Sequence, residues 1–312
     1  MKIVFLDAKS IGEDIDLSAY DALGEVIKYD FSTAEEAAVR SVDADVLVLN
    51  KVEVNEKTIG NASHLKLVCV TATGTNNLDK AYLEKRGIAW RNVAGYSTES
   101  VAQHTFAMLF YLLEKLPYYD RYVKDEKYIG DKMFTHFDKH FGELAKMTWG
   151  IIGLGNIGRR VADIAKAFGC RSTSGRNSQP GYERVSFEEL LKESDIVSVH
   201  APLDENTLDL MNKEAFHQMK KTAIFLNLGR GPIVVEEDLA EALEQGEIAA
   251  AGLDVLRVEP MSPENPLRRI KDSEKLLITP HIAWASVEAR TRLMEIICGQ
   301  IQEFFSNGSP ES

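Results

Sequence analysis

The chain has 312 residues, 45% of them hydrophobic and 27% charged, which is typical of a folded protein of about two domains and excludes wholesale disorder. Lys and Arg number 36 against 48 Asp and Glu, and the net charge of −12 argues against non-specific binding of nucleic acid or anionic membranes. The longest apolar stretch, near 106–113, is well short of the roughly 18 residues that span a bilayer.

The three cysteines, Cys69, Cys170 and Cys298, form neither a CxxC pair nor a cluster with zinc spacing. We therefore expect buried thiols, no metal site and a reducing, cytoplasmic compartment. The first ten residues are too short for a signal peptide and predict a strand.

Strand and helix signals alternate over the first 95 residues. Ser32 and Glu35 have the spacing of a capping box that opens a helix, and a second helix over 78–86 ends at Gly87. Continuous apolar runs are typical of strands buried on both faces. The predicted strands are 3–6, 46–49, 65–70 and 88–90. This alternation predicts a parallel sheet with helices on both sides.

A long helix is predicted from just after Ser97 to about Lys115. The segment 117–141 that follows is rich in aromatic and charged residues and has no clean period. Such a composition suits a connection that contacts a partner, and a surface loop is the alternative.

A second alternating series starts at Met147. Ser186 and Glu189 predict another capping box, and a helix over 237–245 ends at Gly246. A last helix over 286–305 carries an apolar stripe and ends at Gly308. The predicted strands are 149–152, 171–174, 196–200, 223–227, 250–254 and 276–279.

The predicted fold class is α/β, with two doubly wound parallel-sheet domains. The second domain is inserted between the first domain and the final helix. The predicted boundaries are 1–97 plus 287–312 for the first domain and 98–286 for the second.

Gly153, Gly155 and Gly158 form a G-x-G-x-x-G string between a predicted strand and a predicted helix, the context that a dinucleotide site requires. Gly153 allows the tight turn, Gly155 lets the backbone approach a pyrophosphate, and Gly158 lets helix and strand pack closely. The helix N-terminus offers N–H groups to the anion. The alternative is a plain glycine-rich turn.

The position that would read the cofactor ribose has no carboxylate. An acid about 20 residues into the motif binds the 2′-hydroxyl of NAD, whereas Arg176 and Asn177 stand there, 23 and 24 residues after Gly153. A guanidinium attracts a 2′-phosphate. We therefore expect NADP to be preferred over NAD. The alternative is a surface Arg in a protein that uses both cofactors.

Four ionisable residues follow three later strands: Arg230, Asp254, Glu259 and His281. Ligands bind at the carboxyl ends of strands in open α/β sheets, so these residues are expected to converge there. Hydride transfer to a carbonyl needs a proton donor, which a His oriented by a carboxylate supplies, while an Arg grips a substrate carboxylate. A surface ion pair and a structural His are the alternatives for each residue taken alone.

These strings together resemble the D-isomer-specific 2-hydroxyacid dehydrogenases over nearly the whole chain. The carrying segments, besides the glycine motif, are 73–79, 101–105, 199–203, 227–231, 253–255, 259–260 and 280–281. The resemblance implies a flavodoxin-like substrate domain, a Rossmann dinucleotide-binding domain, a cleft between them and a homodimer.

The resemblance also implies roles for individual residues. Arg230, Glu259 and His281 would be catalytic, and Asp254 would hold the nicotinamide carboxamide. Backbone amides around Thr73 and Gly74 would bind the substrate carboxylate, Lys51 could reach it unless solvated, and Trp284 would wall the pocket. His104 is expected to serve packing. The other implied cofactor contacts are Thr105, Asn156, Ile157, His200, Ala201, Pro202, Thr207 and Leu228.

Segments 95–98 and 281–286 resemble the glycerate dehydrogenase (hydroxypyruvate reductase) branch. This implies reduction of hydroxypyruvate or glyoxylate, with D-lactate or a bulkier D-2-hydroxy acid as the alternative substrate. Formate dehydrogenase shares the fold but is expected to have Gln where Glu259 stands. A dinucleotide-sensing co-repressor is the alternative of a different class, and the absence of basic tracts favours the enzyme.

Overall fold

The structure is a computed structural model that describes residues 1–175 and 182–306. The chain divides into two compact units, Met1–Ser97 with Ala285–Ser312 and Thr98–Trp284, called here the N-terminal unit and the second unit. Among the helices of the described residues, none combines the length and the hydrophobicity that a membrane-spanning helix needs.

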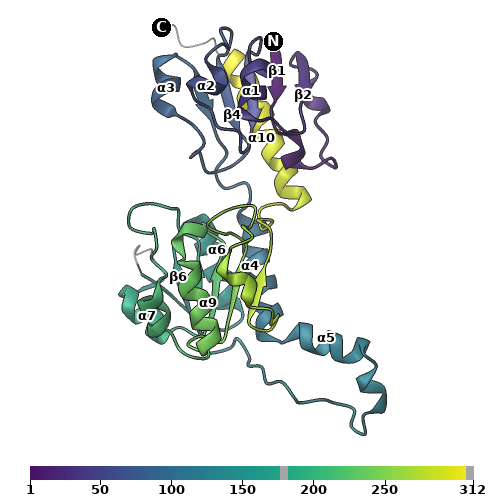
Figure 1. Cartoon of the computed structure of the whole chain (residues 1–312), viewed down its shortest axis with the longest axis vertical. Helices are drawn as coiled ribbons and strands as arrows, with labels where there is room; N and C mark the ends of the chain where they lie inside the picture. The colour runs from purple at the N-terminus through teal and green to yellow at the C-terminus, as the bar shows by residue number, and fades with distance from the viewer. Residues whose placement is uncertain (176–181, 307–312) are drawn as a thin grey trace. The chain divides into compact units, whose positions relative to one another are not determined.

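The N-terminal unit contains, over its described residues, a five-stranded parallel sheet in the order β2-β1-β3-β4-β5 (Figure 1). The strands are β1 Lys2–Phe5, β2 Glu25–Lys28, β3 Val46–Leu49, β4 Leu67–Val70 and β5 Ala89–Arg91. The helices are α1 Ala34–Arg40, α2 Glu56–Ile59, α3 Lys80–Lys85 and α10 Val287–Ser306. This strand order is that of flavodoxin-like sheets.

Helices cover both faces of this sheet. On one face, Ala37 of α1, Ile59 of α2 and Leu83 of α3 pack with Leu47 and Leu49 of β3. On the other face, the Tyr20 ring packs edge-on against Phe5, and its hydroxyl donates to the Met294 carbonyl of α10 at 2.7 Å. Both faces of the central strands are therefore buried, as their continuous apolar runs predict.

Three features of this unit differ from the sequence prediction, and the first is the short helix α2, which was not predicted. The edge strand β2 was not expected, because only two of its four residues are apolar and its ends are exposed. The capping box lies one residue later than predicted, with Thr33 and Glu36 as its members. Ser32, the predicted cap, instead donates its hydroxyl to the Leu6 carbonyl at 2.6 Å.

The described residues of the second unit form a seven-stranded parallel sheet in the order β12-β11-β10-β9-β6-β7-β8. The strands are β6 Thr148–Ile152, β7 Arg171–Ser174, β8 Glu183–Arg184, β9 Ile196–Val199, β10 Ile224–Asn227, β11 Ala250–Leu253 and β12 Leu276–Ile278. The helices are α4 Thr98–Leu113, α5 Leu116–Lys124, α6 Asn156–Ala167, α7 Phe187–Glu193, α8 Lys213–Gln218 and α9 Glu236–Gln245.

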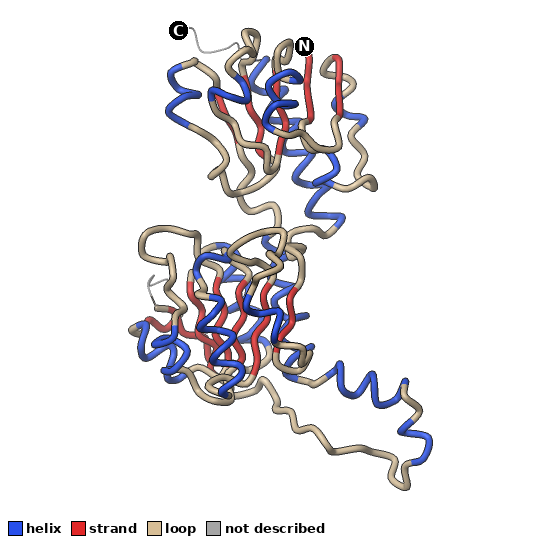
Figure 2. Tube along the Cα trace, in the orientation of Figure 1, coloured by secondary structure: helices blue, strands red, loops and turns tan. Residues whose placement is uncertain are grey.

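This second sheet is also wound on both sides (Figure 2). Helices α4 and α6 cover one face together with Trp149 and Ile151, and α7, α8 and α9 cover the other with Val197 and Phe225. The strand order reverses between β6 and β9, which is the Rossmann arrangement with its ligand crevice at that point. The predicted fold class is confirmed, and all three cysteines are buried.

The segment 116–141, called here the arm, extends away from the sheet of the second unit (Figure 1). It contains α5, where no helix was expected, and none of the residues of α5 is buried. Tyrosine hydrogen bonds tie its outgoing and returning limbs together, from Tyr118 to His136 at 2.8 Å and from Tyr119 to the Lys139 carbonyl at 2.7 Å. The arm is thus an ordered projection with little core of its own.

Candidate active site

The glycine turn between β6 and α6 has the shape that a dinucleotide requires. Gly153 has φ +96°, and a Cβ added there would lie 2.5 Å from the Ala201 nitrogen. A Cβ on Gly158 would lie 2.1 Å from the Gly153 oxygen, so only glycine allows α6 to approach this closely. A Cβ on Gly155, the N-cap of α6, would meet nothing within 4 Å, so this side of the turn is open to a ligand.

His200 directly follows β9, the strand paired with β6, and its backbone lies beside the glycine turn. The Trp149 indole donates to the Ser198 hydroxyl at 2.9 Å, and that hydroxyl lies 3.0 Å from His200 Nε2. If Ser198 gives its single proton to Nε2, the imidazole carries its own proton on Nδ1. Burial lowers the pKa of His200 to about 3, so the ring is neutral at pH 7.

The Nδ1 atom of His200 is buried and has no hydrogen-bond partner among the described residues. A buried polar nitrogen without a hydrogen-bond partner costs free energy, which a polar group of a bound ligand would recover. This unpartnered nitrogen and the open Gly155 turn both fit a nicotinamide dinucleotide at the switch point. Such a group would be held by the glycine turn and the N-terminus of α6.

The remaining predicted cofactor residues occupy varied positions. Thr105 is fully buried, and its hydroxyl donates to the Val101 carbonyl within α4 at 2.7 Å. Thr207 is nearly buried and donates to the Pro202 carbonyl at 2.8 Å, which shapes the loop after β9. Leu228 and Ala201 are buried, Ile157 is half-buried, and Asn156 accepts a bond from Arg159. Their cofactor contacts stay predictions, and Arg176 and Asn177 lie outside the described residues.

Asp254, directly after β11, holds the segment that carries His281. Its side chain is 2% exposed. One carboxylate oxygen accepts from the Thr279 hydroxyl at 2.6 Å and from the Ile282 N–H at 2.9 Å, and the other accepts from the Ala283 N–H at 2.9 Å. The Asp254 carbonyl also accepts from the His281 N–H at 2.8 Å.

His281 and Glu259 come together as predicted for a proton-donating pair. His281 Nδ1 lies 2.7 Å from a Glu259 oxygen, and the two side chains are 29% and 31% exposed. The other Glu259 oxygen accepts from the Leu256 N–H at 2.9 Å, which fixes the carboxylate. Because Nδ1 faces the carboxylate, Nε2 is the nitrogen that can serve a substrate.

Arg230 stands on a tight turn after β10. The buried Asn227 side chain accepts from the Gly229 N–H and donates to the Arg230 carbonyl, both at 3.0 Å. A Cβ on Gly231 would lie 1.9 Å from the Leu256 carbonyl group, so this turn packs directly on the loop that leads to Glu259. The Arg230 guanidinium donates to the Gly229 carbonyl at 2.8 Å and has further N–H groups for an anion.

The predicted substrate residues of the N-terminal unit lie after its neighbouring strands β3 and β4. Asp7, which is buried after β1, accepts from the Lys51 N–H at 2.7 Å and from the Asn50 N–H at 2.8 Å. Burial raises the pKa of Asp7, and these backbone donors oppose that rise. Thr73 donates its hydroxyl to the Val93 carbonyl at 2.9 Å, which holds the loop that contains Gly74.

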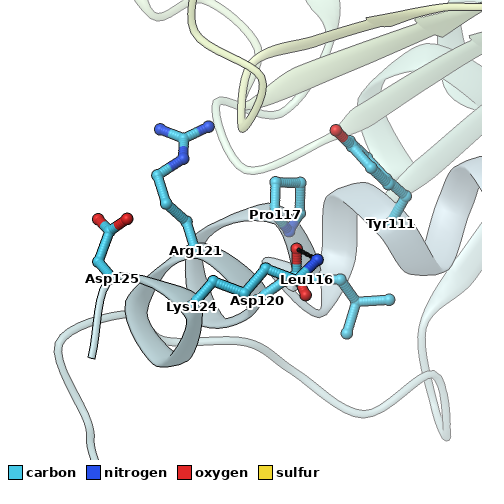
Figure 3. A pocket seen from close by; sticks show the side chains of 7 residues that line it. All are labelled: Tyr111, Leu116, Pro117, Asp120, Arg121, Lys124 and Asp125. Atoms are coloured by element: carbon cyan, nitrogen blue, oxygen red, sulfur yellow. Dashed lines mark hydrogen bonds and ion pairs between the residues drawn. The ribbon is translucent and has the colours of Figure 1, made fainter. Parts of the chain in front are cut away.

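The side chain of Trp284 packs half-buried against the apolar cluster of α4 and α6. A cavity of about 560 Å³ lies elsewhere, at the base of the arm (Figure 3). Its lining residues are Tyr111, Leu116, Pro117, Asp120, Arg121, Lys124 and Asp125. No predicted catalytic residue is among them.

Sequence reasoning missed three residues of this site. Asn227 and Thr279 stand inside strings that were singled out, but neither was given a role. His104 was expected to serve packing, whereas its Nε2 lies 3.0 Å from the Thr279 hydroxyl. The available signal for Thr279 was its position two residues before His281, and the signal for His104 was its place in the segment 101–105 that carries the resemblance.

Comparison with known proteins identifies the family to which the chain is similar. A family model described as "D-isomer specific 2-hydroxyacid dehydrogenase, NAD binding domain" matches residues 106–283. The chain is 37% identical over 320 residues to hydroxypyruvate reductase of Blautia hydrogenotrophica, covering 99% of this chain and 98% of the relative. It is 33% identical over 312 residues to glycerate dehydrogenase of Methylorubrum extorquens, covering 100% and 98%.

A similar solved structure is that of D-lactate dehydrogenase from Aquifex aeolicus complexed with NAD and lactic acid. Its TM-score is 0.85 at 26% identity, with 98% of this chain and 96% of that chain covered. The family predicted from the motifs is confirmed. The chain belongs to the D-isomer-specific 2-hydroxyacid dehydrogenases, which are oxidoreductases that act on CH–OH groups.

Proposed function

We propose that this chain reduces a small 2-oxo acid, hydroxypyruvate or glyoxylate, to the corresponding 2-hydroxy acid, with a nicotinamide dinucleotide as the hydride donor. The second unit binds the dinucleotide and the N-terminal unit binds the substrate. The observation that carries the proposal is the 2.7 Å contact between His281 Nδ1 and Glu259. The names of the similar hydroxypyruvate reductase and glycerate dehydrogenase support this substrate class.

His281 is the proton donor in this proposal. A bound reduced dinucleotide supplies the hydride that the carbonyl carbon accepts. The imidazolium of His281 gives its Nε2 proton to the carbonyl oxygen and becomes the neutral ring with its proton on Nδ1. Glu259 accepts that N–H and stabilises the cationic form before transfer.

Arg230 binds the substrate carboxylate and polarises the carbonyl group, because a guanidinium forms paired hydrogen bonds with a carboxylate. Lys51 and the backbone amides of Thr73 and Gly74 contribute to carboxylate binding in this proposal. In this proposal Asp254 also holds the nicotinamide carboxamide. Its carboxylate oxygens accept the amide N–H through lone pairs that are not used by Thr279, Ile282 and Ala283.

An initial-rate screen tests the reaction. Hydroxypyruvate, glyoxylate, pyruvate and phenylpyruvate are each measured with NADPH and with NADH. The highest kcat/KM is expected for hydroxypyruvate or glyoxylate. A maximum at pyruvate or phenylpyruvate would favour the D-lactate or bulkier-acid alternative. Dinucleotide binding with no turnover of any substrate would favour the sensing role.

We further propose that NADP is preferred over NAD. The support is the sequence, in which Arg176 stands where an acid would read the ribose hydroxyl. Replacing Arg176 with Asp is expected to raise the ratio of kcat/KM for NADH over NADPH at least about tenfold, because a carboxylate repels the 2′-phosphate. Asn177→Asp is the matched variant one residue along. An unchanged ratio in Arg176→Asp would show that another residue reads the phosphate.

We propose a homodimer in which the arm packs against a second copy of the chain. Its large apolar side chains are 61–86% exposed at Ile129, Met133, Phe134 and Phe137. A monomer rarely leaves such a patch in water. The hydrogen bonds within the arm preorganise it for association, which lowers the entropy cost of binding.

Light scattering coupled to gel filtration tests the dimer. The expected mass is twice 34.8 kDa for the native chain and 34.8 kDa for the double variant Ile129→Asp, Phe134→Asp. Phe31→Asp, at a residue of the N-terminal unit that is 65% exposed, is the matched control and should keep the native mass. A native mass of 34.8 kDa would contradict the proposal.

A further inference from the structure

The imidazole of His104 contacts the segment before His281 rather than its own helix. His104 lies on α4, which packs against β10, β11 and β12. Its Nε2 is 3.0 Å from the Thr279 hydroxyl, although 175 residues separate the two along the chain. The same nitrogen is 3.7 Å from a carboxylate oxygen of Asp254, and the His104 side chain is 21% exposed.

The contacts of Thr279 determine which nitrogen of His104 carries the proton. The Thr279 hydroxyl donates its only proton to the Asp254 carboxylate at 2.6 Å, and an ionised carboxylate can only accept. The bond between Thr279 and His104 must then run the other way, from Nε2–H to the hydroxyl oxygen. His104, Thr279 and Asp254 thus form a directed chain of two hydrogen bonds, called here the strut.

The strut ends on the backbone that orients His281. The Asp254 carboxylate accepts the Ile282 and Ala283 N–H groups, and its carbonyl accepts the His281 N–H. His281 has φ +56°, a left-handed backbone conformation that is unfavourable for a non-glycine residue. The hydrogen bonds of the His281 N–H and of the Ile282 N–H to Asp254 hold the backbone in this conformation. In it, the His281 ring contacts Glu259.

We propose that His104 is a positioning residue for His281, acting through Thr279 and Asp254. This inference rests on the proposed role of His281 as the proton donor. Without the His104 donor, the Thr279 hydroxyl can rotate away from Asp254, and the carboxylate holds the 279–283 segment less tightly. Proton transfer depends on that geometry, whereas the glycine turn that binds the dinucleotide does not.

Kinetics of paired variants test the strut. His104→Leu removes the first hydrogen bond of the strut and Thr279→Val removes both, each at similar side-chain size, and each should lower kcat about tenfold, as expected within one network. The KM for the 2-oxo acid and the dissociation constant for NADPH should change less than about twofold. His104→Gln and Thr279→Ser keep a donor in place and should recover most of kcat. The double variant His104→Leu, Thr279→Val should lose no more than either single variant.

Three kinetic results would overturn the proposal. They are an unchanged kcat in both single variants, a loss in His104→Gln equal to that in His104→Leu, and additive losses in the double variant. Melting temperatures identify a variant that does not fold. In that case the kcat values of Thr279→Ser and His104→Gln are compared with that of the native chain instead.

Nitrogen-15 NMR of the histidine-labelled chain tests the strut without turnover. The His104 ring is expected as the Nε2–H tautomer, and His104→Leu should shift the ring signals of His281. An Nδ1–H tautomer, or unmoved His281 signals, would overturn the inference. If the native chain turned over no 2-oxo acid, the proposed function would fail, and this measurement would still decide the strut.

Discussion

His281 Nδ1 and the carboxylate of Glu259 lie 2.7 Å apart, and the second Glu259 oxygen is held by the Leu256 N–H. The partners are 22 positions apart along the chain, and the strand β12 lies between them. A carboxylate fixed on one side and bonded to an imidazole on the other orients the ring and leaves Nε2 for chemistry.

Removing the imidazole should stop proton transfer without disturbing dinucleotide binding. His281→Ala is expected to lower kcat by about 100-fold or more, the usual contribution of a general acid. Glu259→Gln, which removes the charge that stabilises the imidazolium, should lower kcat by a smaller factor. Steady-state rates and an NADPH titration by fluorescence measure both effects. His217→Ala, at a side chain that is 78% exposed, is the control, and an active His281→Ala would assign the proton donor elsewhere.

Arg230 should contribute chiefly to binding of the acidic substrate. Arg230→Met removes the guanidinium while keeping the aliphatic stem, and we expect kcat/KM for the 2-oxo acid to fall about 100-fold, since hydrogen bonds to charged groups are worth about 1.5–3 kcal/mol. Arg230→Lys should recover only part, because an ammonium lacks the paired geometry. The NADPH dissociation constant, from the same fluorescence titration, should be unchanged. Equal kcat/KM for the native chain, Arg230→Met and Arg230→Lys would show that residues other than Arg230 bind the substrate carboxylate.

The two glycines at the start of α6 should respond differently to alanine. A Cβ at Gly155 meets nothing within 4 Å, so Gly155→Ala should keep the melting temperature and raise the dinucleotide dissociation constant at least about tenfold, or ~1.4 kcal/mol. A Cβ at Gly158 lies 2.1 Å from the Gly153 oxygen, so Gly158→Ala should lower the melting temperature. Calorimetry measures both quantities.

Gly299→Ala in α10 is the matched control, because a Cβ there also meets nothing within 4 Å. It should leave dinucleotide affinity unchanged and stabilise the helix by roughly 1 kcal/mol. Tight dinucleotide binding by Gly155→Ala would show that the ligand does not approach this turn.

Acid should destabilise the fold through His200. Burial lowers the pKa of His200 in the folded state to about 3, from an ordinary 6.5. Between these values the unfolded chain binds one more proton at this site, so the free energy of unfolding falls as the pH falls through that window. The slope attributable to one proton is about 1.4 kcal/mol per pH unit.

Urea unfolding at pH 4 to 6 measures this effect. His200→Gln should reduce the slope of unfolding free energy against pH by about 1.4 kcal/mol per pH unit, the contribution of one proton. His64→Gln, at an exposed position, should leave the slope unchanged. Parallel curves for the native chain and His200→Gln would show that the folded protein admits the imidazolium at this position.

Much of the architecture could be predicted because its signals are local. Val46–Leu49 is apolar throughout since both faces of β3 are covered, and the glycine turn is specified by three glycines within six residues. Ser186 caps α7 by accepting the Glu189 N–H, which is one of the two hydrogen bonds of the predicted capping box. By contrast, β2 has exposed ends and α5 has no buried residue, so neither shows the continuous apolar run of a buried element, and neither was predicted.

The amino-acid sequence alone determined the two α/β units, the glycine turn and the set of residues that end the later strands, because each depends on neighbours a few positions away. The tertiary structure decided which of these residues meet. Glu259 joins His281, and His104 reaches Thr279 across 175 residues. Such contacts follow from sheet order and helix packing, which bring distant backbone together and which no short window of sequence encodes.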